Sequence, residues 1–357
     1  MNRLFPSHHT GAGRRQHSAS DSLIRSVWLS ALALAALTTL AFTPSANAQS
    51  RPVLVAAGGY HSCVVMDTGR PKCWGYNAYG QLGVNDTVNR GDVPGQMGSA
   101  LPGIFVNQVG PIIQMALGGF HTCALDGVGK VWCWGYNVFG QLGYGHTNNI
   151  GDNAGELNGG SPYVTSGVQK IAAGSYHTCA LKFGGVVWCW GYNAYGQLGT
   201  GDTQNRRDGV NNAFAVPSLG TGRRAIDITA AAYSTCVLLD DQSIKCWGYN
   251  GVGTLGAGDT ITRGDGPGEM GDAVPAVNLG GFGPVKQLSG GGYHVCATNS
   301  GANIKCWGYN VFGQLGLGDT NARGDGPGEM GNTLPFVAGY GNFDWTIVSG
   351  LYHNCTH

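Results

Sequence analysis

Short apolar stretches alternate with glycine-rich turns along most of the chain. In one such segment, Ile112–Leu117 predicts a β-strand, which Gly118-Gly119 ends. His121–Asp126 and Lys130–Tyr136 predict two more strands, which flank a turn at Gly127–Gly129. Each segment of this kind is therefore expected to form a small antiparallel sheet of three or four strands.

The alternation of side chains also predicts the register of the second and third strands. If they pair about Val128, Cys123 faces Cys133 on one side of the sheet, and Ala124 faces Trp132 on the other. The same rule predicts further facing pairs on the cysteine side: Leu125 and Val131, Leu181 and Val187, and Leu238 and Ile244.

The segment is repeated. The letters CWGYNAYGQLG occur at Cys73–Gly83 and again, without change, at Cys189–Gly199. Close variants begin at Cys133, Cys246 and Cys306, so the copies follow at intervals of 60, 56, 57 and 60 residues. A fixed period of this length is the signature of a repeat architecture.

One small sheet cannot bury its apolar face alone, but sheets packed radially against one another can. The sequence therefore predicts an all-β protein, a β-propeller with five complete blade repeats and a partial sixth that opens around Cys355. The repeated Trp is expected to fill the gap between neighbouring sheets. A β-sandwich does not predict a period near 58 residues, and a linear solenoid is the remaining alternative.

Cysteine occurs twice in every complete copy, ten residues apart, at facing positions of the predicted hairpin. Five disulfides are therefore expected: Cys63–Cys73, Cys123–Cys133, Cys179–Cys189, Cys236–Cys246 and Cys296–Cys306. Metal binding is the alternative, but a ten-residue Cys spacing with one His per copy does not match a zinc pattern. Cys355 has no partner ten residues further on, which indicates a truncated sequence or a free thiol.

The first 48 residues differ from the rest. Arg14, Arg15 and Arg25 precede the apolar run Val27–Phe42, and Ala46-Asn47-Ala48 follows it. This order predicts a signal peptide at residues 1–48 and a repeat domain at residues 49–357. The 16-residue run is shorter than the roughly 20 residues that span a bilayer. We expect a protein that is secreted or held in the cell envelope, with no membrane span in its mature chain.

Charge and composition narrow the function. Without residues 1–48 the chain keeps 16 basic and 19 acidic side chains, and it shows no basic stripe, so nucleic acid is not an expected partner. No nucleophile elbow, phosphate loop, catalytic carboxylate pair or zinc-protease motif occurs. We predict no catalytic residue, no cofactor and no metal site.

Two further groups recur at fixed positions. A His follows the Gly-Gly break in five of six copies, and we interpret it as structural, bonded to the backbone of its own blade, although a ring of His is also a metal-binding pattern. The insert between blades repeats Asp-Thr-x-x-Arg-Gly-Asp, whose charges are expected to pair or to satisfy turns. Integrin-type recognition and calcium binding are the alternatives. The candidate binding residues are Arg90, Asp92, Arg263, Asp265, Arg323 and Asp325.

The segment GGFHTCALDGVGKVWCWGYNVFGQLGYG closely resembles the repeat of the regulator of chromosome condensation family. The resemblance extends over about residues 51–357 and implies a propeller, typically of seven blades. Founding members of the family are nucleotide exchange factors for a small GTPase, and others are ligase domains or secreted bacterial proteins. The signal peptide, the paired cysteines and the long inserts depart from the founding type, so no catalytic residue is carried over.

Taken together, the residues predict an exported scaffold without catalysis that binds an unknown protein or a surface polymer. Exchange-factor activity and a structural adhesin are the alternatives. Binding is expected at the inserts, which vary most between copies, and not at the CWGYN segments, which we interpret as core.

Overall fold

The computed structural model describes residues 50–106, 110–159, 164, 166–339 and 346–356. The chain divides into two units, Met1–Gln49 and Ser50–His357, and every described residue belongs to the second. The predicted signal peptide at residues 1–48 lies outside the described residues.

The second unit is built almost entirely from short strands. In chain order these are β1 (Pro52–Ala57), β2 (His61–Met66), β3 (Pro71–Gly75), β4 (Ile112–Leu117), β5 (His121–Asp126), β6 (Val131–Gly135), β7 (Val168–Ala173), β8 (His177–Lys182), β9 (Val187–Gly191), β10 (Ala225–Ala230), β11 (Ser234–Leu239), β12 (Ile244–Gly248), β13 (Val285–Gly290), β14 (His294–Asn299), β15 (Ile304–Gly308), β16 (Ile347–Ser349) and β17 (Asn354–Thr356). The inserts add the 3-10 turns η1 (Gly98–Ala100) and η2 (Gly271–Ala273) and the one-turn helix α2 (Glu156–Gly159).

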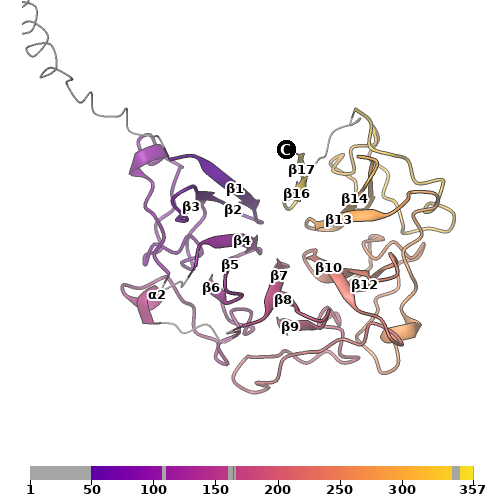
Figure 1. The fold of residues 1–357 in the computed structure, drawn as a ribbon, viewed down its shortest axis with the longest axis horizontal. Helices are drawn as coiled ribbons and strands as arrows, with labels where there is room; N and C mark the ends of the chain where they lie inside the picture. Colours follow the sequence, from indigo (N-terminus) through magenta and orange to yellow (C-terminus); the bar gives the residue numbers. More distant parts are fainter. Residues whose placement is uncertain (1–49, 107–109, 160–163, 165, 340–345, 357) are drawn as a thin grey trace, which may run out of the picture. The chain divides into compact units, whose positions relative to one another are not determined.

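Each repeat is one antiparallel sheet with its strands in sequence order, for example β4-β5-β6. Five sheets have three strands and the sixth has two, β16 and β17. We number the sheets as blades 1 to 6 along the chain. The inner strands β1, β4, β7, β10, β13 and β16 surround a common axis, as Figure 1 shows, and each lies against the next. The predicted all-β propeller is confirmed.

The predicted register is confirmed as well. Cys123 lies opposite Cys133, Ala124 opposite Trp132, and Leu125 opposite Val131. The equivalent pairs follow in blades 3 and 4, with Leu181 opposite Val187 and Leu238 opposite Ile244. The register was predictable because the short Gly127–Gly129 turn sets the pairing of the hairpin, and a slip by one residue would move its side chains to the other face of the sheet.

The repeated Trp fills the space between blades. Trp134, Trp190, Trp247 and Trp307 are at most 1% exposed, and each indole N–H donates a hydrogen bond to a carbonyl of the preceding blade. The acceptors are Gln81, Gln141, Gln197 and Thr254, at 2.9–3.1 Å. Trp74 in blade 1 is only half-buried. Blade packing, and not the hairpin alone, therefore buries this residue.

A buried Asn organises the turn that follows each hairpin. In blade 2, the Asn137 side-chain oxygen accepts the backbone N–H of Leu142 at 2.9 Å, which directs Leu142 into the core. The amide group of Asn137 donates to the carbonyls of His146 and Asn148 in the following insert, both at 2.8 Å. One side chain thus ties the turn to the insert, which explains why Asn recurs in every complete copy.

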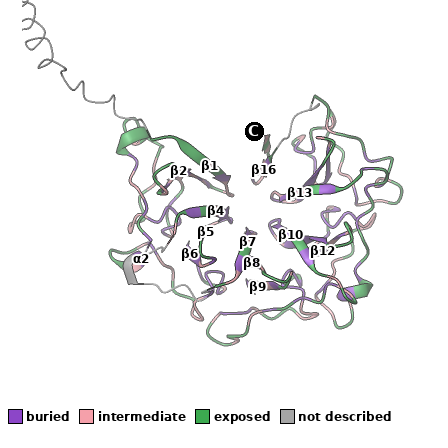
Figure 2. Cartoon of the chain, viewed as in Figure 1, coloured by how far each residue is buried: buried purple, intermediate pink, exposed green. Residues whose placement is uncertain are grey.

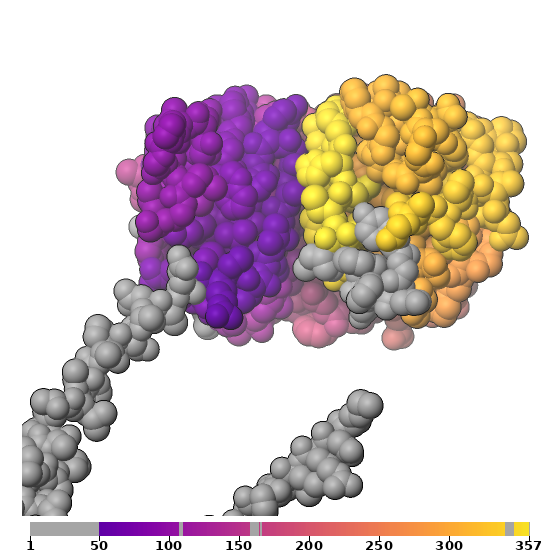
Figure 3. Space-filling model, turned by 90° about the horizontal axis from the view of Figure 1, so that it is seen from above, coloured from indigo at the N-terminus to yellow at the C-terminus, as the bar shows by residue number. Residues whose placement is uncertain are grey.

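Backbone hydrogen bonds near the axis join successive blades. The amides of Gly59, Gly119, Ser175, Ala232 and Gly292 donate to carbonyls of the next blade at 2.7–3.3 Å. Blade 6 then lies beside blade 1, since β16 contacts β1, and the yellow and indigo surfaces meet in Figure 3. Among the described residues, however, no backbone hydrogen bond joins Leu351 to Gly59, and β1 and β16 belong to separate sheets.

Blade 1 differs from blades 2 to 4, which have a three-stranded neighbour on both sides. Val53 and Val55 of β1 are 66% and 53% exposed, and β1 is largely green in Figure 2 whereas the interior strands are mostly buried. The described residues form six sheets, and not the seven that the family resemblance implies. The contact between β1 and β16 therefore brings together the two least buried blades.

Candidate binding surface

Up to three aromatic positions in each repeat lie at one end of the propeller. The first precedes the middle strand, the second follows the outer strand, and the third stands in the turn after it. In antiparallel sheets these strand ends coincide, so the side chains gather on one face. We call this set the aromatic end; it comprises Tyr60, Phe120, Tyr176, Tyr233, Tyr293 and Tyr352, then Tyr76, Tyr136, Tyr192, Tyr249 and Tyr309, and then Tyr79, Phe139, Tyr195 and Phe312.

The rings form an unbroken chain of contacts around this face. The third-position ring of one blade packs against two rings of the next: Tyr79 lies 5.7 Å from Phe120 and 4.6 Å from Tyr136, centroid to centroid. Phe139 repeats this arrangement with Tyr176 and Tyr192, at 5.5 and 4.6 Å. Most pairs meet edge to face, the geometry that ring quadrupoles favour, so the rings hold one another in fixed positions.

The aromatic end is half exposed and carries no charge. Phe312 is 66% exposed, Tyr60 53% and Tyr352 44%, and the set contains only Tyr and Phe. Burial of the ring raises the pKa of Tyr176, Tyr192 and Tyr293 above the ordinary tyrosine value, so their hydroxyl groups stay neutral. A large, rigid and uncharged apolar surface of this kind marks an interaction site.

This surface was not predicted from the sequence, because the CWGYN segments were interpreted as core throughout. The structure divides the motif: its Trp is buried between blades, whereas its Tyr belongs to the aromatic end. The signal was present, since an aromatic residue recurs after the Gly-Gly break and again after CWG. Without the blade orientation, nothing in the sequence distinguished those rings from packing residues.

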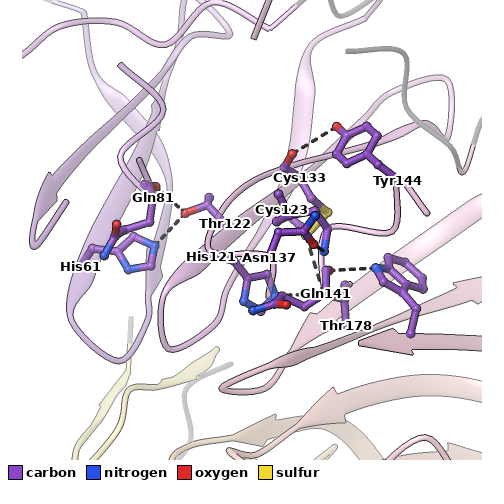
Figure 4. Close-up of a disulfide and its surroundings, with 12 residues drawn as sticks. His61, Gln81, His121, Thr122, Cys123, Cys133, Asn137, Gln141, Tyr144 and Thr178 are labelled. Atoms are coloured by element: carbon purple, nitrogen blue, oxygen red, sulfur yellow. Dashed lines mark hydrogen bonds between the residues drawn. A yellow bond between two sulfur atoms is a disulfide. The ribbon is translucent and has the colours of Figure 1, made fainter. Parts of the chain in front are cut away.

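A row of buried histidines supports the aromatic end from below. Nε2 of His61 lies 2.7 Å from Oγ1 of Thr122, and that hydroxyl donates to the Gln81 carbonyl at 2.8 Å. Figure 4 shows this relay between blades 1 and 2, close to the Cys123–Cys133 disulfide. Because the Thr hydroxyl already donates its proton to Gln81, it accepts from the His, which therefore carries a proton on Nε2.

The predicted structural role of the His is thus supported, but the predicted partner was wrong. The His ring lies over a glycine of its own blade, such as Gly118 beneath His121, yet it bonds the next blade, as in His177 to Thr235 at 3.0 Å. Burial lowers the pKa of His61, His121 and His177 to about 3. The hydrogen bond crosses a blade interface, which the repeat alone does not reveal.

The ten repeat cysteines form five disulfides within single blades, in the pairing expected above. The Cα atoms of each pair are 4.1 Å apart, and all ten residues are buried. Cys355 in β17 is exposed and unpaired. The disulfides stiffen each hairpin beneath the aromatic end, and those of blades 1 to 4 share a core cluster with the Trp of the following blade.

The inserts hold the six candidate binding residues, and the arginines among them are engaged within the loop. Arg90 pairs with Asp86, Arg263 with Asp259 and Arg323 with Asp319, with N–O distances of 2.6–2.7 Å. Each guanidinium also donates to a carbonyl of its own loop. The expected pairing of charges is present, but it uses the first Asp of the motif and not the Asp of Arg-Gly-Asp.

The Gly-Asp part of the motif packs against the preceding blade. Gly264 is buried, and its carbonyl accepts the amide of Gly201 at 3.1 Å. Asp265 is half-buried, and burial raises the pKa of its carboxyl group. Asp325 occupies the same position in the next insert, whereas Asp92 of blade 1, beside the two-stranded blade 6, is exposed. In most copies the Gly-Asp part of the motif therefore packs at the interface between two blades.

Polar side chains also connect the inner strands around the axis. Gln114 of β4 exchanges two hydrogen bonds with the backbone of Ile171, at 2.8 and 2.9 Å. One blade further on, Lys170 of blade 3 forms an ion pair with Asp227 of blade 4. Asp227 also accepts a hydrogen bond from the backbone amide of Leu288 in blade 5, at 3.0 Å. These contacts fix the blades relative to one another.

Neither a metal centre nor a spanning helix is found in the described part of the chain. Across residues 50–356, apart from the gaps given above, no three His, Cys, Asp or Glu side chains gather as metal ligands would. Within the same residues, no helix has the length and apolarity needed to cross a bilayer.

Comparison with known proteins places the repeat in a family. The family model described as RCC1-like domain matches residues 13–343. Similar curated proteins include the ultraviolet-B receptor UVR8 of Arabidopsis thaliana, 27% identical over 275 residues, which are 75% of this chain and 56% of that protein. The probable E3 ubiquitin-protein ligase HERC4 of Homo sapiens is 31% identical over 220 residues, which are 59% of this chain and 18% of that protein. The chain thus spans only part of these relatives.

Solved structures support the fold. Human WBSCR16 aligns with a TM-score of 0.61 at 24% identity, covering 86% of this chain and 72% of that one. Prp20p of Saccharomyces cerevisiae, whose structure was described with its binding to Gsp1p and histones, aligns with a TM-score of 0.60 at 20% identity, covering 86% and 68%.

Proposed function

Because the chain belongs to the RCC1-like domain family, we propose that it is an exported, non-catalytic propeller that binds a partner protein at its aromatic end. The observation that carries this proposal is the continuous chain of contacts among uncharged Tyr and Phe side chains on one face. The cores of protein interfaces are rich in aromatic side chains and poor in charge.

The chemistry of the rings favours a protein partner. Tyrosine offers a large contact area and one polar tip, and it has few rotatable bonds to order on binding. Here neighbouring rings already restrain one another, and the disulfide-stapled blades hold them in place. A pre-formed surface loses less entropy on association, so more of the contact energy contributes to affinity. The protein contacts that a relative's description reports, Gsp1p and histones for Prp20p, concern that protein alone.

Export is the second part of the proposal. Five disulfides are the form that cysteines take in oxidising compartments, and residues 1–48 have the pattern of a signal peptide. Sequencing the N-terminus of the protein isolated from the producing cells tests this part. A first residue at or near Gln49 is the expected result, and a retained Met1 in the mature protein would contradict export.

Site-specific photo-cross-linking in the producing cells tests the binding surface. We choose Phe312, 66% exposed on the aromatic end, and Val210, 94% exposed on an insert, and replace each in turn with p-benzoylphenylalanine. A discrete cross-linked protein from position 312 but not from position 210 is expected. Cross-links only from position 210, or from neither, would overturn the proposed surface. Cross-links to glycan alone would replace the protein partner with a surface polymer.

A further inference from the structure

Blade 4 departs from the aromatic pattern at one point. The third aromatic position is filled by Tyr79, Phe139, Tyr195 and Phe312 in the other complete blades, but by Val252 in blade 4. The residue before it is Gly251, where the other copies have Ala or Val. Blade 4 therefore lacks the ring that would pack against Tyr293 and Tyr309 of blade 5.

The missing ring leaves a pocket in the aromatic end. The pocket has a volume of about 370 Å³. Its lining consists of Tyr195, Tyr233, Tyr249, Tyr293, Tyr309, Tyr352 and Val252. Gly251 contributes as well, because the hydroxyl of Tyr249 lies where a side chain at position 251 would begin. The absence of a side chain at Gly251 thus allows the Tyr249 ring to lie close to the turn.

The lining has an unusual chemistry. Six of its seven residues are tyrosines, and none carries a charge. Among the described residues, no hydroxyl of these six tyrosines makes a hydrogen bond to another protein atom. Burial raises the pKa of Tyr233, so the phenol stays neutral. The faces of aromatic rings carry partial negative charge, which repels anions and attracts cations.

We propose that this tyrosine pocket binds a quaternary ammonium group, as in choline. Such a cation is weakly hydrated and fits between aromatic rings, whereas a primary ammonium ion would require hydrogen-bond acceptors stronger than phenols. The pocket is large enough for a trimethylammonium head group, and open hydroxyls can accept from the rest of the ligand. The inference rests on the proposed role of the aromatic end as the binding surface.

Two small probes of nearly the same shape test the proposal on the mature protein. Choline carries the positive charge, and 3,3-dimethyl-1-butanol is its uncharged isostere. Titration calorimetry is expected to show choline binding at least tenfold more tightly than the isostere. Equal affinity would show a merely apolar pocket, and binding of neither would show no site for this group; both results overturn the proposal.

Variants locate the site. Val252→Phe supplies the ring that the other blades possess, so it is expected to fill the pocket and abolish choline binding without lowering the melting temperature. The matched control is Val138→Phe, which adds the same ring at an exposed position of blade 2 and is expected to leave choline binding unchanged. Tyr293→Ala removes a wall and is expected to weaken binding at least fivefold. Choline binding that survives both Val252→Phe and Tyr293→Ala would overturn the assignment.

A vesicle experiment separates the sources of the group. Co-sedimentation with phosphatidylcholine vesicles but not with phosphatidylglycerol vesicles would identify a lipid head group. Choline binding without vesicle binding would identify a free small molecule. Choline binding is measured without any partner protein, so it can fail while the proposed function holds. If Val252→Phe abolishes choline binding but leaves cross-linking from position 312 intact, the pocket and the protein-binding surface are separate functions.

Discussion

The insert loops and the aromatic end differ in burial from what their sequences suggest. The inserts vary between copies and carry Arg-Gly-Asp, yet their arginines pair within the loop and Gly264 packs against the preceding blade. The aromatic end is built from the least variable letters of the repeat, yet it is half exposed. Residues that are repeated in every copy can therefore form an exposed surface as well as a core. Segments that vary between copies can lie in the packed interface between blades.

The largest expected effect concerns the scaffold that both regions share. Each disulfide closes a loop of about ten residues and contributes on the order of 2–3 kcal/mol. Loss of all five would remove about 10–15 kcal/mol, which is comparable to the whole stability of many domains. We expect reduction to unfold the propeller. Peptide mapping of the non-reduced protein checks the pairing, and linkages between blades would contradict it.

Acid is expected to affect the aromatic end before the inserts. The folded pKa of His61, His121 and His177 is about 3, so below pH 6.5 the unfolded chain binds protons that the folded chain does not. Stability should therefore fall as the pH falls from about 6.5, by up to about 1.4 kcal/mol per pH unit for each histidine.

The ion pairs of the inserts are expected to respond to acid only at lower pH. The hydrogen bond from Arg263 lowers the pKa of Asp259, so this pair is intact above the ordinary aspartate range and is lost only as the pH falls below it. Thermal melts between pH 7 and pH 4 test the difference. His177→Ser, which copies Ser234 of blade 4, should flatten the dependence between pH 6 and pH 4; an unchanged slope would contradict the account.

The two halves of the CWGYN motif should respond differently to truncation. Trp190→Ala is expected to cost about 3–5 kcal/mol because it opens a cavity between blades 2 and 3. Tyr192→Ala, two residues away, should cost about 1 kcal/mol because its ring is partly exposed. Denaturant unfolding measures both, and equal losses would place the Tyr in the core.

The sequence allowed more of the fold to be predicted than of the site. Facing cysteines and the period-two pattern determine a hairpin, so Cys123–Cys133 and its register followed from local rules. Contacts between blades did not follow. The bond from His61 to Thr122 depends on how one sheet rotates against the next. The same holds for the partial exposure of Tyr192, two residues after the buried Trp190.

A glycine substitution sharpens the structural role of the inserts. Gly91 and Gly264 hold the same motif position, with φ near +90°. Only Gly264 meets the turn of another blade, where the Gly196 carbonyl would lie 2.9 Å from an added Cβ. Alanine should cost about 1–2 kcal/mol at both positions from backbone strain. At position 264 a further ~1 kcal/mol is expected from crowding. Equal melting temperatures of the two variants would show that the contact between Gly264 and the preceding blade does not contribute to stability.

The most direct test compares affinities for the protein that cross-links to position 312. The double variant Phe120→Ala with Tyr176→Ala removes two neighbouring rings, 5.9 Å apart, from the aromatic end. Arg263→Ala with Asp265→Ala removes the charges of one insert. Calorimetry is predicted to show at least tenfold weaker binding for the first variant, as for aromatic hot spots, and less than about threefold for the second. A tenfold loss in the insert variant with an unchanged aromatic variant would contradict the account.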